Sequence, residues 1–430
     1  MYYICSAMEQ TLFTFSFPLR LTTHQRTLVL KQIDGARKLY NMLTELYWAC
    51  WDLGLEVALY ESQAWIVQIR KSNPGVNLVH SQVRQDVNRS VHQAFSMLYK
   101  EKGIPSWRSK KRDPQAITFP QNCVWDEDPV VKGKIGERPI LSLSIPSLGS
   151  VRTKDTWSID PEKVLIRQCK IVYDPLKDGF TLRMTCLIDM EYVKEIHHVD
   201  EPTKEMTAYD FGAHLVLAGS DGTKVKNPRP GEEIIERIKE LQKELQKHVK
   251  GSNSWERCKK EIDRQNRKLA NKRLDFRHKV TTGIVSDNQA IALENLKTKN
   301  MTKSAKGKKA NPGKNVRQKA GLNRKLAEVA FGTMQSMIRY KCALYGRKLY
   351  FVSARNTSIT CSICGHKDKA SRKTQATFCC TKCGHKENAD INAAKNIRGR
   401  ALSLTEVEKA ASIPNPPCNS MNYWWENVKE

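Results

Sequence analysis

Two copies of a short cysteine motif stand in the last quarter of the chain. The first copy contains Cys361 and Cys364, the second Cys380 and Cys383, and each pair is followed by Gly and His. Two Cys-x2-Cys pairs separated by fifteen residues supply the four thiolates of a tetrahedral structural zinc site. The glycine after each pair can take the positive φ that a turn beneath a metal requires. We therefore predict one zinc ion held by these four cysteines.

Three neighbouring side chains could compete for this site. His366 and His385 follow the two glycines and could each replace a thiolate, and Cys379 directly precedes Cys380. Structural zinc is almost always four-coordinate, and the four spaced cysteines already complete the site. Cys379 breaks the two-residue spacing, so we leave it and both histidines out of the ligand set.

Three carboxylates stand out by their positions. Asp210 and Glu294 each end a predicted strand, and Asp390 follows the second cysteine pair at a predicted helix start. Individually they have ordinary explanations as a turn residue, a surface charge at a strand end and a helix N-cap. Together they are the ligands that two magnesium ions need to hydrolyse a phosphodiester, because hard cations prefer carboxylate oxygens.

An Asp-Phe-Gly sequence such as Asp210–Gly212 also occurs in protein kinases. The chain lacks both the Gly-x-Gly-x-x-Gly loop and the His-Arg-Asp sequence that accompany it there. Kinase chemistry therefore has no further support.

The composition indicates a polyanionic partner. The 430 residues include 72 Lys and Arg against 45 Asp and Glu, a formal charge of +27. Such self-repulsion is costly for a protein with neutral partners and is typical of nucleic-acid binding. The cysteines outside the zinc set form no disulfide framework, and we find neither an export signal nor eighteen consecutive apolar residues. We expect a soluble, intracellular protein with two or three domain cores.

Apolar patterns divide the first half of the chain into helical and β-rich parts. Alternation over residues 11–21 predicts a strand. Helical spacing predicts one helix around 29–50 and another around 83–98. Short apolar runs between 103 and 188 predict a β-rich segment.

The second half alternates strands and helices. A charged helical stretch over 231–287, broken once, separates the two strands that end on acids. Residues 295–325 contain eleven Lys or Arg and no acid, which predicts a mobile basic loop that contacts phosphates. A helix over 326–345 and a strand over 348–353 then lead to the zinc motifs.

These motifs resemble the split RuvC nuclease motifs of the TnpB transposon-encoded proteins and of the related miniature type V CRISPR effectors. The resemblance is carried by Asp210-Phe-Gly, Leu-Glu294-Asn-Leu, the cysteine pairs and Ala389-Asp-Ile-Asn-Ala-Ala-Lys-Asn-Ile. It covers residues 10–400 and is specific in the second half. Looser upstream matches are Lys38–Asn41, Gln93–Phe95 and Gly103–Lys111.

The resemblance implies a multidomain α+β protein. Its parts would be an RNase H-like (RuvC) α/β nuclease core with a zinc-ribbon insertion, a helical recognition lobe and a β-barrel-like wedge domain. The implied ranges are 1–23 and 103–200 for the wedge, 24–102 for the recognition lobe, 201–355 and 386–400 for the nuclease, 356–385 for the zinc-binding module and 401–430 for a disordered tail. The module would bind target nucleic acid and help to load the target strand.

The implied activity is RNA-guided cleavage of DNA by two-metal RuvC-type hydrolysis. Asp210, Glu294 and Asp390 carry over as ligands of two Mg²⁺ ions, beside one structural Zn²⁺. The implied partners are a guide RNA and double-stranded target DNA with a short adjacent motif, without a membrane, and a homodimer on the RNA stays open. The implied location is the cytoplasm of a bacterium or archaeon, at the nucleoid. The alternatives are an RNA-guided DNA-binding regulator without cleavage and a zinc-ribbon DNA-binding protein without guide RNA.

Basic and aromatic side chains supply the expected nucleic-acid contacts. Arg355 could reach the scissile phosphate, and a structural contact is equally open. The others are Lys297, Lys299, Lys303, Trp107, Arg108, Lys110 and Lys111. Asn295 and Asn388 stand where many relatives carry acids. Neither is one of the three core ligands, so we expect cleavage to survive with altered metal affinity.

Overall fold

The computed structural model describes residues 10–135, 138–212, 215–227, 231–296, 298–308 and 311–404. These residues fall into two compact units, one that ends at Ile196 and one that begins at His197. The finer domain division drawn from the sequence stays a prediction. No helix in the described ranges is long and apolar enough to cross a membrane.

The first unit is built on a seven-stranded antiparallel sheet with the order β2-β6-β7-β1-β5-β4-β3. Its central strand β1 (Gln10–Arg20) buries Phe13, Phe15 and Phe17, because alternate side chains face the same side. The strand predicted over 11–21 is therefore confirmed. The other strands are β2 (Gln115–Phe119), β3 (Val124–Ile135), β4 (Arg138–Ile145), β5 (Gly149–Lys154), β6 (Leu165–Asp174) and β7 (Gly179–Asp189).

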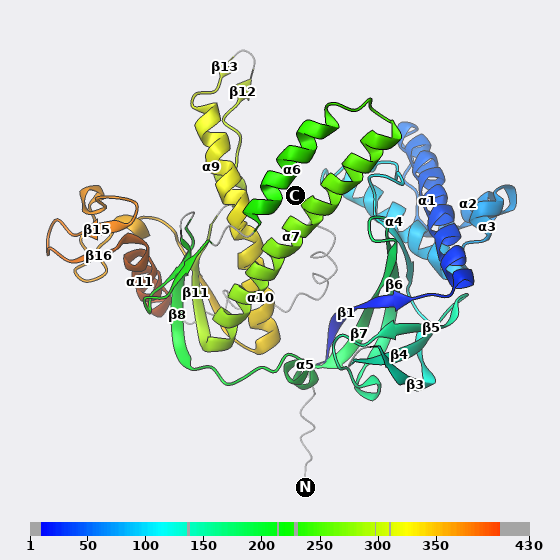
Figure 1. The fold of residues 1–430 in the computed structure, drawn as a ribbon, viewed down its shortest axis with the longest axis horizontal. Coiled ribbons are helices and arrows are strands. Elements are labelled where there is room, and N and C mark those ends of the chain that lie inside the picture. The colour runs from blue at the N-terminus through cyan, green and yellow to red at the C-terminus, as the bar shows by residue number, and fades with distance from the viewer. Residues whose placement is uncertain are drawn as a thin grey trace, which may run out of the picture. The chain divides into compact units, whose positions relative to one another are not determined.

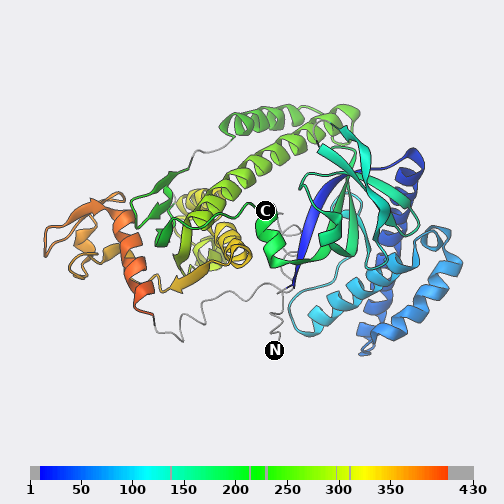
Figure 2. The same ribbon diagram turned by 90° about the horizontal axis from the view of Figure 1, so that it is seen from below.

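A group of helices follows β1 and gathers beside the sheet (Figure 2). Its members are α1 (Thr23–Asp52), α2 (Leu59–Ser72), α3 (Pro74–Asn77) and α4 (Ser81–Tyr99). The side chains of Thr22 and Gln25 begin α1 with a reciprocal capping box. Helices α1 and α4 pack against each other and against β2. Both predicted helices are confirmed. The short helices η1 (Pro161–Lys163) and α5 (Met190–Ile196) complete the unit.

The second unit contains a five-stranded mixed sheet with the order β10-β9-β8-β11-β14. Its strands are β8 (Lys204–Asp210), β9 (Leu215–Gly219), β10 (Lys224–Lys226), β11 (Asn288–Glu294) and β14 (Lys348–Val352). Strand β11 lies between β8 and β14 and runs parallel to both, whereas β9 is antiparallel to β8. Adjacent parallel strands end at the same edge of a sheet, so Asp210 and Glu294 share one edge.

The connection from β10 to β11 contains a helical hairpin, formed by α6 (Glu232–Leu245) and α7 (Asn253–Asp287) (Figure 1). The break predicted near Gly251 is confirmed, and Ser252 caps α7 by accepting a hydrogen bond from Trp255 N. The apolar seam between the two helices consists of Ile234, Ile238, Leu241, Cys258, Ile262 and Leu269.

The basic segment over 295–325 differs from the predicted loop. It contains α8 (Thr298–Met301), β12 (Gly307–Lys308), β13 (Asn311–Pro312) and the start of α9 (Val316–Val329). Lys and Arg are good helix formers, so a run of them does not prevent a helix. The predicted helix over 326–345 is two helices, because Ala330 takes a φ of 54° between α9 and α10 (Phe331–Tyr345).

The zinc motifs lie between β14 and the last described helix, α11 (Ala389–Leu402). This module contains η2 (Thr357–Ile359), η3 (Lys369–Ser371) and the hairpin of β15 (Thr377–Cys379) with β16 (Lys386–Asn388). Helix α11 packs on β8, β9, β11 and β14. It continues past residue 401, where the tail was predicted to begin, and residues 405–430 lie outside the described part.

Candidate active site and metal centre

The four predicted zinc ligands meet in the module. Their sulfur atoms all lie within 4.8 Å of one another. The Sγ atoms of Cys361 and Cys383 are 3.7 Å apart, and those of Cys364 and Cys380 are 3.6 Å apart. Four sulfurs at about 2.3 Å from a tetrahedral zinc would be separated by about 3.8 Å, so the cluster fits this ion. Among the described residues, no other group of three or more Cys, His, Asp or Glu was found as a metal cluster.

Two matching turns bring the cysteines together. The backbone N–H of Gly365 donates to Cys361 O at 3.0 Å, and that of Gly384 donates to Cys380 O at 3.0 Å. The φ angles of the two glycines are 71° and 72°. This left-handed conformation is the one predicted for the glycine after each pair, and a side chain with a Cβ would be strained there.

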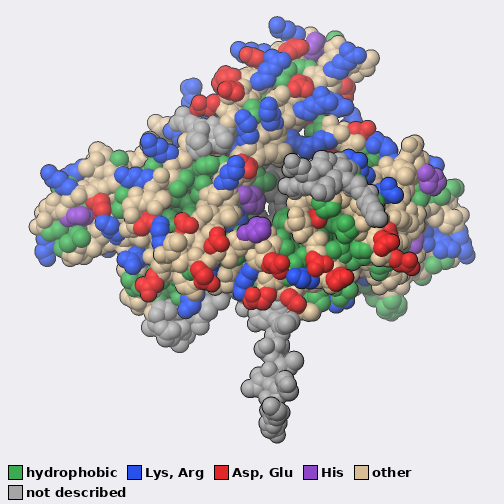
Figure 3. All heavy atoms as spheres, turned by 60° about the horizontal axis from the view of Figure 1, so that its bottom comes forward, with side chains coloured by type: hydrophobic (Ala, Val, Ile, Leu, Met, Phe, Trp, Pro, Cys, Tyr) green, Lys and Arg blue, Asp and Glu red, His purple; other side chains and the backbone are tan. Residues whose placement is uncertain are grey.

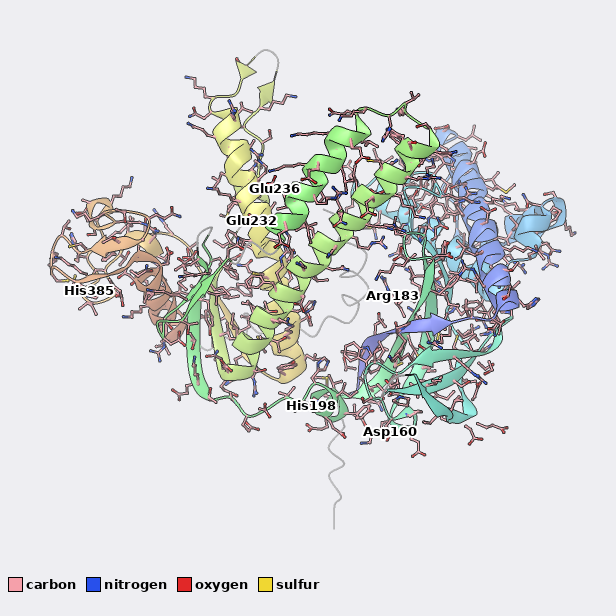
Figure 4. The ribbon with its side chains drawn as sticks, in the orientation of Figure 1. Asp160, Arg183, His198, Glu232, Glu236 and His385 are labelled. Atoms are coloured by element: carbon pink, nitrogen blue, oxygen red, sulfur yellow. The ribbon has the colours of Figure 1, made fainter. Side chains whose placement is uncertain are left out.

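The histidines lie outside the sulfur cluster. His385 is labelled in Figure 4, and its Nε2 lies 3.4 Å from Glu387 Oε2. Glu387 also pairs with Lys395. The metal-binding group consists of the four cysteines and includes neither His366 nor Cys379. The sulfur cluster therefore contains the four cysteines that the spacing predicts as ligands, and their binding of zinc stays a prediction.

The three predicted acids come from three elements that meet at one edge of the mixed sheet. Asp210 is the last residue of β8, Glu294 the last of β11 and Asp390 the second of α11. Strands β8 and β11 are paired in register up to Tyr209 and Leu293, one residue before each acid. Because α11 packs on both strands, it carries Asp390 to the edge where the other two acids lie.

The pKa of Asp210 shows that the other two carboxylates lie near it. Burial and the negative charges of Glu294 and Asp390 raise the pKa of Asp210 to about 8. Burial also raises the pKa of Glu294, which is only 7% exposed. Burial and like charges both disfavour the ionised carboxylates, and a bound cation would relieve both. The three carboxylates offer the oxygen donors that a hard divalent cation prefers, but their oxygens do not all gather within the 4.8 Å that encloses the four sulfurs.

Hydrogen bonds hold Glu294 at its position. The Thr357 hydroxyl donates to Glu294 Oε1, and Gln335 Nε2 donates to the backbone oxygen of Glu294 at 2.8 Å. Thr357 belongs to η2, at the entrance to the zinc module, and Gln335 belongs to α10. Thr357 thus restricts the buried carboxylate, and Gln335 restricts the backbone that carries it.

Asp390 is not the N-cap of α11. Asn388 is the cap, and its Oδ1 accepts hydrogen bonds from the N–H groups of Asp390 at 3.1 Å and Ile391 at 3.2 Å. The Asp390 carboxylate is therefore not needed to cap the helix. The backbone at Gly212 passes close to it: a Cβ added there would lie 3.8 Å from Asp390 Oδ2 and only 2.7 Å from Leu215 O. The close contact with Leu215 at the start of β9 therefore favours glycine at this position.

Sequence reasoning missed Arg372. This residue lies between the two cysteine pairs, and its Nη2 is 3.2 Å from Asp390 Oδ1. Its positive charge also opposes part of the rise in the pKa of Asp210. Arg355, which sequence reasoning considered, is exposed, and no ion pair is found for it in the part of the chain that the structure describes. Nothing in the sequence distinguishes Arg372 from the other basic residues of the module.

Two further residues that sequence reasoning missed fasten the module to α11. Asn392 Oδ1 accepts from Ser362 N at 2.9 Å, and its Nδ2 donates to Thr360 O at 2.8 Å. Asn396 Nδ2 donates to Thr357 O at 2.9 Å and to Thr360 O at 2.7 Å. The spacing of four residues places both amides on one face of the helix, which was the available signal. These hydrogen bonds fix Thr357, Thr360 and Ser362, the residues around Cys361, against α11.

Only part of the predicted basic contact surface can be described. Lys303 is exposed. Lys297 and the side chain of Lys299 lie outside the described residues. Figure 3 shows Lys and Arg side chains spread over the visible face, with Asp and Glu among them. Binding of nucleic acid by these lysines stays a prediction.

The loop before β2 carries the other predicted contacts. Trp107 is 50% exposed. The Arg108 guanidinium lies 3.7 Å from the centre of the Tyr40 ring, and Lys110 Nζ lies 3.1 Å from Asp34 Oδ1. Arg108 and Lys110 therefore have partners within the first unit, and their contact with nucleic acid stays a prediction.

Comparison with known proteins gives two family matches and several relatives. Residues 331–397 match the family described as Cas12f1-like, TNB domain, and residues 188–305 match OrfB_IS605, described as probable transposase. InsQ of Escherichia coli (strain K12), named as a candidate RNA-guided DNA endonuclease, is 28% identical over 320 residues, which cover 74% of this chain and 73% of InsQ. The CRISPR-associated endodeoxyribonuclease Cas12f2 of Micrarchaeota archaeon (strain CG1_02_47_40) is 40% identical over 83 residues, 18% of this chain and 15% of the relative.

A solved structure shares the fold. The cryo-EM structure of the Cas12f1-sgRNA-target DNA complex contains a chain that superposes with a TM-score of 0.54 at 16% identity. The superposition covers 87% of this chain and 82% of that chain. At this identity the likeness concerns the fold alone, which is a multidomain α/β architecture.

Proposed function

We propose that this chain, a member of the family of TnpB proteins and miniature type V CRISPR effectors, is an RNA-guided DNA endonuclease. Its partners would be a guide RNA and double-stranded target DNA with a short adjacent motif, in a bacterial or archaeal cytoplasm. Base pairing would read the target, while the protein would hold both nucleic acids along their backbones. The formal charge of +27 supports this division of labour.

The observation that carries the proposal is the convergence of Asp210, Glu294 and Asp390. We propose that they hold two Mg²⁺ ions, which when bound would activate a water and stabilise the leaving oxygen of the phosphodiester. The donor chemistry supports this assignment, because two of the three carboxylates have pKa values raised by burial, Asp210 also by its acidic neighbours. The rigid attachment of Glu294 and Asp390 would keep their oxygens in place during cleavage.

We assign to Arg372 the role that sequence reasoning considered for Arg355. A guanidinium beside Asp390 can donate paired hydrogen bonds to the oxygens of a target-strand phosphate. The zinc ion would fold the module that carries this arginine. Through Asn392 and Asn396, the same module would brace α11 and so position Asp390.

The test uses the full chain expressed with its own flanking locus. The RNA that co-purifies is sequenced, and the complex is given matched target DNA, flanked by a randomised adjacent segment, in Mg²⁺. We expect cleavage by the wild type and retention of RNA by Asp210→Ala with at least about a 100-fold slower cut, since losing even an outer partner of a metal ligand costs 10–100-fold. Asp263→Asn, an exposed carboxylate on α7, is the matched control.

The outcomes separate the alternatives. Guided binding by the wild type without cleavage would favour the regulator. The absence of a discrete RNA would favour the zinc-ribbon DNA-binding protein. Cleavage by Asp210→Ala at the wild-type rate would remove Asp210 from the active site.

A further inference from the structure

A cavity of about 680 Å³ lies within the first unit, outside the proposed active site. It is lined by α1, α4, β2, β6 and the loop that carries Arg108, and it is partly open to solvent. Pockets that bind small molecules have volumes of about 300–1,000 Å³, so the cavity is large enough for one nucleotide.

The polar lining of the cavity contains both donors and acceptors. Its charged side chains are Arg37, Arg108, Lys110, Lys170, Asp34, Asp86 and Asp113. Arg37 and Lys110 already lie 2.9 Å and 3.1 Å from Asp34 Oδ1. The four cations exceed the three acids by only one, and two of the cations already pair with Asp34, whereas a phosphate site would need a larger excess. This mixture instead favours an uncharged polar ligand, and the nucleobase is the uncharged part of the polyanion that the +27 charge indicates.

Arg108 is arranged to bind such a ligand. Its guanidinium stacks on Tyr40, 3.7 Å from the ring centre. The Asn41 side chain fixes its backbone, accepting from Arg108 N at 2.7 Å and donating to Arg108 O at 2.9 Å. No hydrogen bond or ion pair of this guanidinium is found within the described ranges. A stacked guanidinium keeps its N–H edge available for in-plane acceptors.

Asp86 supplies the complementary acceptor. It lines the same cavity from α4. Burial raises the pKa of Asp86, while a hydrogen bond with Thr118 and the charges of Arg89, Lys170 and Arg108 oppose this rise. No ion pair is found between Asp86 and Arg108 in the described part of the chain. In addition, the buried Nε of Arg37 has no hydrogen-bond partner. The cavity thus presents a carboxylate and unpaired guanidinium N–H groups.

We propose that this cavity binds one unpaired guanine of the guide RNA, an assignment that rests on the proposed function. Guanine carries two neighbouring donors, N1–H and N2–H, which suit Asp86, and two neighbouring acceptors, O6 and N7, which suit Arg108. Guanine is the base that offers both pairs at once. RNA is favoured over duplex DNA because unpaired RNA bases can enter a pocket, whereas a paired DNA base must first be flipped out.

The test probes the purified complex with kethoxal, which modifies unpaired guanine at N1 and N2. We expect one guanine of the bound RNA to be protected in the wild type and reactive in Asp86→Asn. The affinity for RNA should fall roughly tenfold, the effect of losing one bidentate base contact. Asp52→Asn, an exposed carboxylate at the end of α1, should leave that guanine protected. Arg108→Lys keeps the charge but not the planar fork, and should expose the same guanine.

Each result has a defined consequence. A guanine that stays protected in both Asp86→Asn and Arg108→Lys overturns the pocket assignment, and Arg108→Lys alone decides if Asp86→Asn does not fold. A guanine of single-stranded target DNA that is protected in the wild type and reactive in Asp86→Asn, with no such guanine in the RNA, overturns the choice of RNA. If no discrete RNA co-purifies with the wild type, the proposed function fails, which is a different outcome from an RNA bound without a protected guanine.

Discussion

Arg372 Nη2 lies 3.2 Å from Asp390 Oδ1, so an arginine of the zinc module forms an ion pair with the carboxylate in the first turn of α11. Both side chains are largely covered, with exposed fractions of 25% and 15%, and solvent therefore screens this pair less than a surface pair. The pair connects the cysteine cluster to the acidic edge of the mixed sheet. A cation bound at Asp390 has to share this carboxylate with Arg372 or displace it.

Replacing Arg372 should slow the reaction. We expect Arg372→Ala to lower the single-turnover cleavage rate at saturating Mg²⁺ roughly 10- to 100-fold, as for partners of metal ligands. Arg372→Lys should recover only part of the loss, because a lysine lacks the planar fork. Arg355→Ala is the matched control. Equal losses in Arg372→Ala and Arg355→Ala would contradict the assignment.

The acidic cluster should lower the free energy of unfolding of the metal-free protein. At pH 7 the folded protein keeps Asp210 largely protonated, because its pKa is about 8, whereas the unfolded chain ionises it and is stabilised by doing so. Asp210→Asn removes this difference, so we expect it to raise the free energy of unfolding by roughly 1–4 kcal/mol in Mg²⁺-free buffer. Adding Mg²⁺ should raise the unfolding temperature of the wild type more than that of the variant. The measurement is thermal unfolding with and without Mg²⁺. A variant less stable than the wild type without Mg²⁺ would show that Asp210 is not strained by its neighbours.

Loss of zinc should displace Asp390, because the cysteine cluster packs against the start of α11. Cys361, Cys380, Phe378 and Ala389 form one buried cluster, and Ala389 directly precedes Asp390. We expect Cys383→Ser to lose its zinc and most of its cleavage while it keeps the RNA. Cys379→Ser, which lies outside the ligand set, should behave as the wild type. Zinc content is measured by elemental analysis beside the cleavage rate. Full cleavage by zinc-free protein would disprove the coupling.

The attachment of the module to α11 can be tested with the zinc in place. Asn392→Ala removes the hydrogen bonds to Ser362 and Thr360 but no zinc ligand. We expect one zinc ion per chain and cleavage lowered roughly 10-fold or more, as for loss of an outer partner. An unchanged rate would show that the cysteine cluster alone positions Asp390.

A buried lysine should make stability depend on pH. Lys341 Nζ donates to Thr281, Thr282 and His278 O, and burial lowers the pKa of Lys341 from 10.5 to about 8. The folded state therefore binds this proton less tightly than the unfolded chain does, so stability is gained as the pH rises from 8 to 10.5 and lost as it falls. Relative to Lys341→Met, the wild type should gain up to about 3 kcal/mol over this interval. Denaturant unfolding of both proteins at each pH measures the difference between their free energies of unfolding. A difference that shrinks as the pH rises would contradict the prediction.

Local patterns predicted most of the secondary structure. The alternation that predicts β1 and the apolar runs that end on Asp210 and Glu294 are confirmed, because a strand buries whichever face is apolar. The break at Ala330 was missed, since a positive φ at a residue other than glycine leaves no sequence signal. The start of α9 was missed because charge was taken to indicate a loop, although Lys and Arg favour helices.

The sequence by itself determined which groups could bind metal: four cysteines whose spacing closes one site, and three acids at the ends of their elements. The tertiary structure alone decided that Arg372 faces Asp390, that Asn392 and Asn396 bind the module to α11, and that Asp86 shares a cavity with Arg108. Periodicity and ligand spacing act between near neighbours in the chain. The contacts of Arg372, Asn392, Asn396 and Asp86 join residues from different elements. These residues meet only because the elements pack against one another, and no short segment encodes that packing.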